Sequence, residues 1–132
     1  HQTLEVNMKT ALVLSGGGVA GALEAGAMHE VLKVIMPDFV VGSSIGAING
    51  ALYCSGNSTQ DLINIWNRTS RRSVLPINFK LLYQLHKAES IFSNKGFVRL
   101  LKKELKVETF EDCHTPLYIA ATELFTGKEH YF

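Results

Sequence analysis

Short apolar runs that end in glycine clusters divide the first half of the chain. The run TALVLS at residues 10–15 is aliphatic and β-branched and is followed by three glycines, which is typical of a buried strand. Residues 22–35 then carry apolar side chains at helical spacing, and Pro37 ends the helix that this spacing predicts. The expected buried face of this helix consists of Leu23, Ala27, Val31 and Ile35.

The same arrangement then follows a second time. Residues 38–41 (DFVV) form another short apolar run, a Gly-Ser-Ser turn follows it, and apolar residues again recur at helical spacing. One side of this second helix is expected to carry Ile45, Ile48 and Leu52. Close packing against a sheet is expected at the small residues Gly46, Ala47, Gly50 and Ala51. Two strands that each lead directly into a helix predict a parallel sheet with a right-handed crossover.

The middle of the chain predicts further helices. Ser58 with Asp61 three residues later is typical of a helix start, and the apolar face expected for that helix consists of Leu62, Ile65 and Trp66. Residues 67–90 are ambiguous and locally basic. We interpret their central piece as an ordinary packed helix, with a lid or an interfacial helix as the alternative. Its expected apolar side consists of Ile77, Leu81 and Leu85.

One more helix and two strands are expected toward the end of the chain. Residues 95–105 have an amphipathic pattern that places Phe97, Leu100, Leu101 and Leu105 inward. Residues 116–124 (PLYIAATEL) predict a third sheet strand, and residues 126–132 predict a fourth that turns back along it. Together these elements predict an α/β protein with three layers, α/β/α, around a mainly parallel sheet.

Length and composition agree with one globular domain. The chain has 132 residues, 46% of them hydrophobic, which is enough to bury a core without disulfides or metals. We assign residues 9–132 to the domain and residues 1–8 to an N-terminal arm or a cloning remnant, because HQTLEVNM lacks the features of a signal peptide. No run of about 18 apolar residues occurs, so the pattern predicts no membrane span.

The net charge of +1 conceals an uneven distribution. Residues 1–67 sum to −3, residues 68–106 to +8 and residues 107–132 to −4. A basic segment of this kind can contact an anionic lipid surface, and a solvated helical face is the alternative interpretation. Aromatic residues are not interleaved with the basic ones as in RNA-binding proteins, so no nucleic acid partner is expected.

The two cysteines exclude some classes of site. Cys54 and Cys113 have no metal-binding spacing and do not suggest a disulfide framework. We expect a reduced intracellular setting, hence a cytoplasmic protein; the basic segment 68–106 is the part expected to contact a membrane peripherally. No metal ion and no organic cofactor are expected.

The first glycine cluster formally matches G-x-G-x-x-G. Its residues are Gly16, Gly17, Gly18, Val19, Ala20 and Gly21. A dinucleotide site would also need an acidic residue at the end of the second strand, but Asp38 lies at the start of that strand. The other use of such a loop is an oxyanion hole, since consecutive glycines let backbone N–H groups converge without side-chain bulk. Gly16, Gly17 and Gly18 are the candidates.

The second cluster matches G-x-S-x-G with Ser44 at its centre. Its residues are Gly42, Ser43, Ser44, Ile45 and Gly46. In a nucleophile elbow the two glycines allow a strand and a helix to approach closely, whereas the alternative is a tight turn with a helix-capping serine. Because both clusters follow parallel strands, both loops lie at the carboxyl edge of one sheet. One loop supplies N–H donors and the other a hydroxyl, so acyl transfer or hydrolysis is the leading interpretation.

The chain resembles the patatin-like phospholipase family. The resemblance lies in LVLSGGGVAG (12–21), VVGSSIGAINGAL (40–52) and PLYIAATELFTGKEHYF (116–132), in the family's order and spacing. It implies a lipid acyl hydrolase with a Ser–Asp dyad, with Ser44 as nucleophile and the 16–21 loop as oxyanion hole. Many members carry a basic residue where this chain has Ala20, so a contact of that residue with an anionic head group is absent here.

The family's aspartate is the second departure. The family takes it from an Asp-Gly-Gly or Asp-Gly-Ala motif downstream of the serine, and none of Asp38, Asp61 and Asp112 precedes a glycine. The histidines His29, His86, His114 and His130 have no motif around them and are interpreted as surface or packing residues. We therefore expect a truncated domain whose aspartate follows Phe132, with little turnover of its own. The alternatives are a non-catalytic fragment or pseudoenzyme that binds acyl chains or a partner, and a nucleotide-binding module.

Overall fold

The computed structural model describes residues 8–17, 20–71 and 94–132. Three of the sequence-based predictions fall outside these ranges: the arm at residues 1–7, the positions of Gly18 and Val19, and the helix expected around Leu81.

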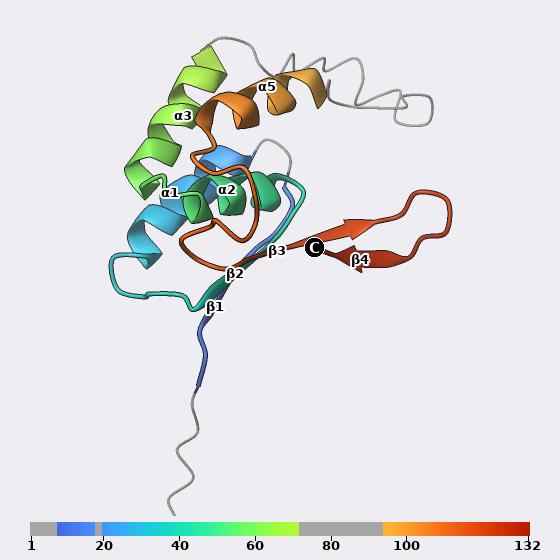
Figure 1. Ribbon diagram of the computed structural model, residues 1–132. Helices are drawn as coiled ribbons and strands as arrows, with labels where there is room; N and C mark the ends of the chain where they lie inside the picture. The colour runs from blue at the N-terminus through green and yellow to red at the C-terminus, as the bar shows by residue number, and fades with distance from the viewer. Residues whose placement is uncertain (1–7, 18–19, 72–93) are drawn as a thin grey trace, which may run out of the picture.

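Four strands form a single sheet in the order β1-β2-β3-β4 (Figure 1). Their bounds are Ala11–Leu14 for β1, Phe39–Ser43 for β2, Leu117–Thr122 for β3 and Glu129–Tyr131 for β4. β1 pairs with β2 and β2 with β3 in parallel, whereas β4 returns antiparallel to β3. The mainly parallel α/β fold predicted from the sequence is thereby confirmed.

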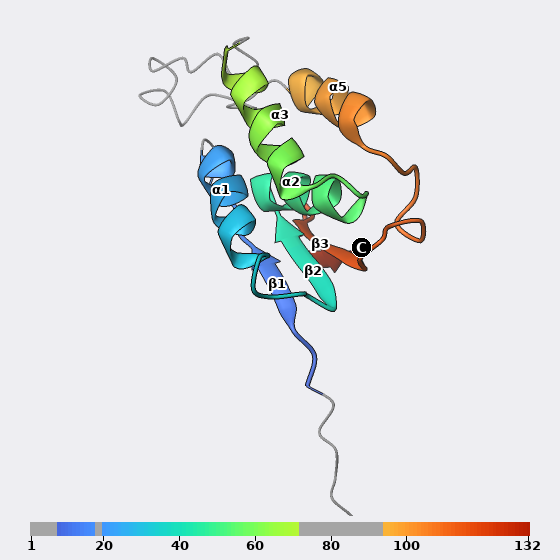
Figure 2. The same ribbon diagram turned by 90° about the vertical axis from the view of Figure 1, so that its left-hand side faces the viewer.

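The described helices lie on one side of this sheet in both views (Figure 2). Their bounds are Gly21–Val31 for α1, Ile45–Cys54 for α2, Thr59–Arg71 for α3 and Asn94–Glu104 for α5. The opposite face carries Val13, which is 70% exposed, and the rings of Phe39 and Tyr118, which pack edge to face at 5.8 Å. The described residues therefore supply one of the two helical layers expected, and the third layer stays a prediction.

The core lies between the sheet and the helices. Its fully buried members come from β2, α1, α2 and α3, and the largest are Val40, Met28, Leu52 and Leu62. On α3, Leu62, Ile65 and Trp66 are buried as predicted, and Leu100, Leu101 and Leu105 of the α5 region pack against the same cluster. α2 contacts β1, β2 and β3, and is therefore the central element of the helical layer.

The prediction for α1 was wrong in its buried face and in its length. Leu23 is 76% exposed, and Ala27, Val31 and Ile35 are exposed as well, while the buried residues are Gly21, Ala25 and Met28. The reason is that α1 packs mainly against α3 and α2 rather than against the sheet. Small residues on that side permit the close approach, and the helix ends at Val31, before the apolar residues at 34–36.

Candidate active site

Ser44 lies at the turn between β2 and α2 in a backbone conformation that L-residues rarely adopt. Its φ is 53° and its ψ −126°, and it is the single non-glycine residue with positive φ in the described ranges. The Ser44 side chain makes no capping hydrogen bond to α2, so the capped-turn interpretation fails. A strained, exposed serine at the start of a helix is the geometry of a nucleophile elbow.

Gly42 and Gly46 must be glycines because other backbone segments lie too close to leave room for a Cβ. A Cβ on Gly42 would lie 2.7 Å from the Cα of Ala47 and from the carbonyl oxygen of Gly46. A Cβ on Gly46 would collide with the carbonyl group of Leu14 at the end of β1. Both neighbours are backbone atoms that cannot rotate away, so the spacing G-x-S-x-G has a direct steric cause.

The first glycine loop lies directly beside Ser44. A Cβ on Gly16 would be 3.0 Å from the Cβ of Ser44 and 3.5 Å from its Oγ. The loop then turns back, because the N–H of Ala20 donates to the carbonyl oxygen of Gly17 over 3.1 Å, and α1 begins at Gly21. The structure thus brings the two glycine clusters together at the carboxyl edge of the sheet, as the parallel strands predicted.

A buried polar network joins the ends of these loops. The side-chain amide of Asn49, which is fully buried, donates to the carbonyl oxygen of Gly21 over 3.0 Å and to Glu24 Oε2 over 2.7 Å. Trp66 Nε1 donates to Asn49 Oδ1 over 2.8 Å. The network connects α2, α1 and α3, and it stabilises the last glycine of the first motif relative to the helix that carries Ser44. The sequence pattern did not predict this network.

Comparison with known proteins identifies the family. The family model described as patatin-like phospholipase matches residues 12–130. This chain belongs to the patatin-like phospholipase family. The match covers both glycine clusters, β3 and most of β4, so the resemblance on which the sequence-based assignment rested is confirmed.

Patatin-like relatives differ greatly in length from this chain. Human patatin-like phospholipase domain-containing protein 6 is 31% identical over 118 residues, and Drosophila grimshawi neuropathy target esterase sws is 30% identical over 117. Each alignment covers 86% of this chain and 8% of the relative. A solved structure of the heterodimeric ExoU–SpcU complex from the type III secretion system of Pseudomonas aeruginosa aligns with a TM-score of 0.49 and 24% identity. That alignment covers 93% of this chain and 32% of the matched chain.

The Ser–Asp dyad expected from the sequence needs an aspartate beside Ser44, and the three aspartates of this chain lie elsewhere. Asp38 precedes β2, at the far end of the strand from Ser44, and its Oδ2 accepts a hydrogen bond from the N–H of Thr10 over 2.6 Å. Asp61 accepts hydrogen bonds from the N–H and hydroxyl of Ser58 over 2.9 and 2.8 Å. Asp112 accepts a 2.8 Å hydrogen bond from the Thr109 hydroxyl.

Asp61 and Asp112 both lie close to the carboxyl end of α2, a helix length away from Ser44. α3, which carries Asp61, begins five residues after α2 ends, and the N–H of His114 donates to the carbonyl oxygen of Cys54 over 2.8 Å. Ten helical residues rise about 15 Å. The expectation that none of the three aspartates serves Ser44 agrees with these positions.

The described histidines also lie away from Ser44. His29 Nδ1 is hydrogen-bonded to Thr59 Oγ1 over 2.9 Å, and the ring of His114 lies against Gly56. His130 on β4 lies toward the carboxyl edge of the sheet, where its Nε2 is 3.5 Å from Glu123 Oε2. Two strand spacings still separate β4 from β2, about 10 Å. His86 lies outside the described residues.

The described residues offer neither a metal site nor a membrane span. Among the residues that the structure describes, no three His, Cys, Asp or Glu side chains are grouped so that they could hold a metal ion. None of the helices in the described ranges has the length and apolar character needed to cross a bilayer.

Proposed function

We propose that this chain carries the nucleophile and the oxyanion loop of a serine hydrolase that cleaves acyl esters of lipids. The observation that carries the proposal is the strained backbone of Ser44 with Gly16 packed against its side chain. An exposed hydroxyl on an elbow, beside a loop free of side-chain bulk, leaves room for a tetrahedral intermediate. Membership of the patatin-like phospholipase family supports a lipid acyl hydrolase at the family level.

In the proposed reaction Ser44 Oγ attacks the carbonyl carbon of the ester and loses its proton to an aspartate. The carbonyl oxygen becomes an oxyanion, which the backbone N–H groups of Gly16, Gly17 and Gly18 stabilise, with Gly17 and Gly18 as the main donors. The positive end of α2 adds to this stabilisation. The bond to the alcohol then breaks, the alcohol leaves with the proton, and water hydrolyses the acyl-enzyme to a free acid.

The aspartate of the proposed dyad is expected in sequence beyond Phe132. Asp38, Asp61 and Asp112 are held at the opposite end of the helical layer, so residues 1–132 alone are expected to turn over esters slowly or not at all. The relatives named above, an esterase and a protein with a phospholipase domain, are much longer than this chain.

The test is labelling with a fluorophosphonate, which reacts with activated serines. In a chain that includes the sequence following Phe132, the proposal expects labelling of wild type and none of Ser44→Ala. Ser43→Ala is the matched control, since it removes the neighbouring hydroxyl and leaves Ser44 in place. If wild type stays unlabelled, or if Ser44→Ala is labelled as well, the hydrolase assignment fails and a non-catalytic binding role takes its place.

We also propose that the basic segment 68–106 contacts anionic lipid at a membrane surface. Among its described residues Arg68, Arg99, Lys102, Lys103 and Lys106 are exposed. Glu104 pairs with Arg68 at 3.3 Å and with Lys103 at 3.6 Å, so Arg99 and Lys102 are the better candidates for lipid contact. A cytoplasmic location belongs to the same proposal and rests on the two free cysteines.

Vesicle flotation tests the lipid contact. Binding should increase with the fraction of anionic lipid and decrease with added salt, because exposed charges are screened within about 8 Å at physiological ionic strength. The single variants Arg99→Glu and Lys102→Glu should each bind less than a variant with the same charge change just after α1, Lys33→Glu. Binding that ignores both salt and anionic lipid would contradict the proposal.

A further inference from the structure

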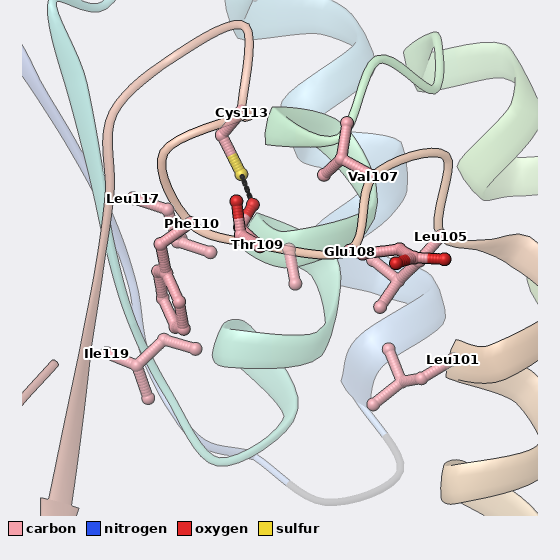
Figure 3. A pocket seen from close by; sticks show the side chains of 10 residues that line it. Leu101, Leu105, Val107, Glu108, Thr109, Phe110, Cys113, Leu117 and Ile119 are labelled. Carbon is pink, nitrogen blue, oxygen red and sulfur yellow. Dashed lines mark hydrogen bonds between the residues drawn. The ribbon is translucent and has the colours of Figure 1, made fainter.

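Cys54 and Cys113 are far apart in the sequence but lie side by side in the fold. Cys54 is the last residue of α2, and Cys113 lies on the loop between α5 and β3, which Figure 3 shows. The N–H of His114, the residue after Cys113, donates to the carbonyl oxygen of Cys54 over 2.8 Å. Two peptide groups joined in this way place the flanking Cα atoms about 5–7 Å apart, within reach of a disulfide.

Further contacts hold this loop against the turn that follows α2. The ring of His114 lies against Gly56, where an added Cβ would be 2.9 Å from the ring carbon Cε1. Lys106 Nζ donates to the carbonyl oxygen of Gly56 over 3.1 Å, and Asn57 Nδ2 donates to the carbonyl oxygen of Glu104 over 3.0 Å. The loop is therefore attached to the turn both before and after the cysteine that it carries.

The two thiols belong to the same packed region. Cys54 is fully buried in the hydrophobic core, and Cys113 packs against that core from its edge. Burial raises the pKa of Cys54 to about 12, and the nearby Cys113 thiol is the second cause. The Cys113 thiol, a weak donor, makes a long bond of 3.9 Å to the carbonyl oxygen of Thr109 (Figure 3). Little therefore opposes its rotation toward Cys54.

We propose that Cys54 and Cys113 are a disulfide site, at which a low-molecular-weight disulfide such as oxidised glutathione converts the two thiols into an intrachain bond. The bond ties the carboxyl end of α2 to the loop before β3. The free cysteines are the reduced state of this pair. A reversible bond of this kind is the usual use of a cysteine pair in a reducing compartment. Its formation does not require hydrolysis at Ser44.

Two exchange steps form the bond. Cys113 reacts first, because its side chain is partly exposed and borders a pocket, whereas Cys54 is fully buried. The Cys113 thiolate attacks one sulfur of oxidised glutathione, the S–S bond of the oxidant breaks, and one glutathione leaves as a thiolate. Cys54 then loses its proton and attacks the Cys113 sulfur of the mixed disulfide, and the second glutathione leaves. Two protein thiols are oxidised to one disulfide, and the oxidant is reduced to two thiols that take up the two protons.

Mass spectrometry of the folded chain tests whether the bond forms. After incubation with oxidised glutathione and quenching with N-ethylmaleimide, wild type should lose two hydrogen atoms, take up no maleimide and yield one linked pair of peptides that contain Cys54 and Cys113. Cys54→Ala should stop at a single glutathione adduct on Cys113, and Cys113→Ala should stay reduced. Dithiothreitol should restore both thiols of wild type. A wild-type chain that stops at the mixed disulfide, or that forms links only between two chains, would overturn the proposal.

A redox titration tests whether the fold favours the bond. The equilibrium constant for disulfide formation with glutathione is measured in buffer and again in urea that unfolds the chain. A disulfide that fits the folded state forms more readily there, by the same factor by which it stabilises the fold. We expect a constant about thirtyfold larger, or more, in the folded chain, and a higher urea midpoint for the oxidised chain than for the reduced one. A constant that is equal or smaller in the folded chain would overturn the proposal, because the fold would then not favour the bond.

Discussion

Trp66 and Asn49 are joined in the core by a 2.8 Å hydrogen bond from the indole N–H to the side-chain oxygen of Asn49. Both residues are buried, Asn49 completely. Because the amide of Asn49 also donates to Gly21 and Glu24, one side chain on α2 pairs with groups of two other helices. Its loss would leave the buried Trp66 N–H without this partner.

We therefore expect Asn49→Leu to lower the free energy of unfolding by about 2 kcal/mol, since an unpaired buried group costs about 1–3 kcal/mol. Urea unfolding followed by Trp66 fluorescence measures the loss. Asn64→Leu, at an exposed position of α3, is the control and should stay close to wild type. If the two variants were equally stable, the network would contribute nothing to the fold.

The strained backbone of Ser44 predicts an unusual order of stability. Ser44→Ala removes the hydroxyl but keeps the Cβ, whereas Ser44→Gly removes the Cβ that makes a φ of 53° unfavourable. We expect Ser44→Gly to be more stable than Ser44→Ala by about 1 kcal/mol in denaturant unfolding. The reverse order, which is usual where φ is negative, would show that the elbow is not strained.

A methyl group on Gly16 should interfere with the reaction and leave the fold intact. The new Cβ would be 3.0 Å from the Cβ of Ser44 and 3.5 Å from its Oγ, so the loop or the serine must shift by a few tenths of an ångström. We expect fluorophosphonate labelling of Gly16→Ala, in a chain that continues past Phe132, to be slower by about tenfold.

The matched control for Gly16→Ala is Gly26→Ala, where an added Cβ meets nothing within 4 Å. Because Gly26 lies inside α1, this change should leave the labelling rate unchanged and raise the free energy of unfolding by about 0.5–1 kcal/mol. Equal labelling rates in the two variants would separate Gly16 from the site.

The start of α3 should make stability depend on pH in acid. Hydrogen bonds from the Ser58 hydroxyl and then from its N–H hold the pKa of Asp61 below its ordinary value of 3.8. Because the carboxyl pKa is lowered on folding, the charged Asp61 stabilises the folded state at pH values above 3.8. This contribution is lost as the pH falls through the folded-state pKa. The stability difference between wild type and Asp61→Asn should therefore shrink in that window.

Ser58→Ala provides the check on that mechanism. It removes the serine hydroxyl, which donates to Asp61 Oδ2 over 2.8 Å and accepts from the Asp61 N–H over 3.1 Å. It should cost about 1 kcal/mol at neutral pH, as other helix caps do, and less when Asp61 is already Asn. If the stability losses of Ser58→Ala and Asp61→Asn simply add in the double variant, the two residues do not act together as one helix cap.

The elements that the sequence predicted correctly are those whose cause is local. Gly42, Ser44 and Gly46 follow from one turn, and Ser58 with Asp61 forms the expected cap within four residues. The buried face of α1 was missed because the hydrophobic spacing of a helix does not say which neighbour the helix packs against. Leu23 fits the pattern and is exposed, while Ala25 and Met28 contact the core.

The network around Asn49 had no signal in the sequence for a related reason. A lone asparagine among small residues is compatible with an exposed helix position, and its partners Gly21 and Trp66 are 28 and 17 residues away. Only the packing of three helices brings these groups together. A polar residue in an otherwise apolar helix segment, IGAINGAL, could have been examined as a buried hydrogen-bonding residue.

The backbone contact between Gly46 and Leu14 fixes the position of the two glycine loops relative to each other. β1 ends at Leu14, two residues before Gly16. α2 begins at Ile45, the residue after Ser44. A backbone-to-backbone contact therefore sets the distance between Ser44 and the first glycine loop. Replacing side chains around the site will change what it accepts and how fast it reacts, but the gap between its two halves will keep its width as long as residue 46 has no Cβ.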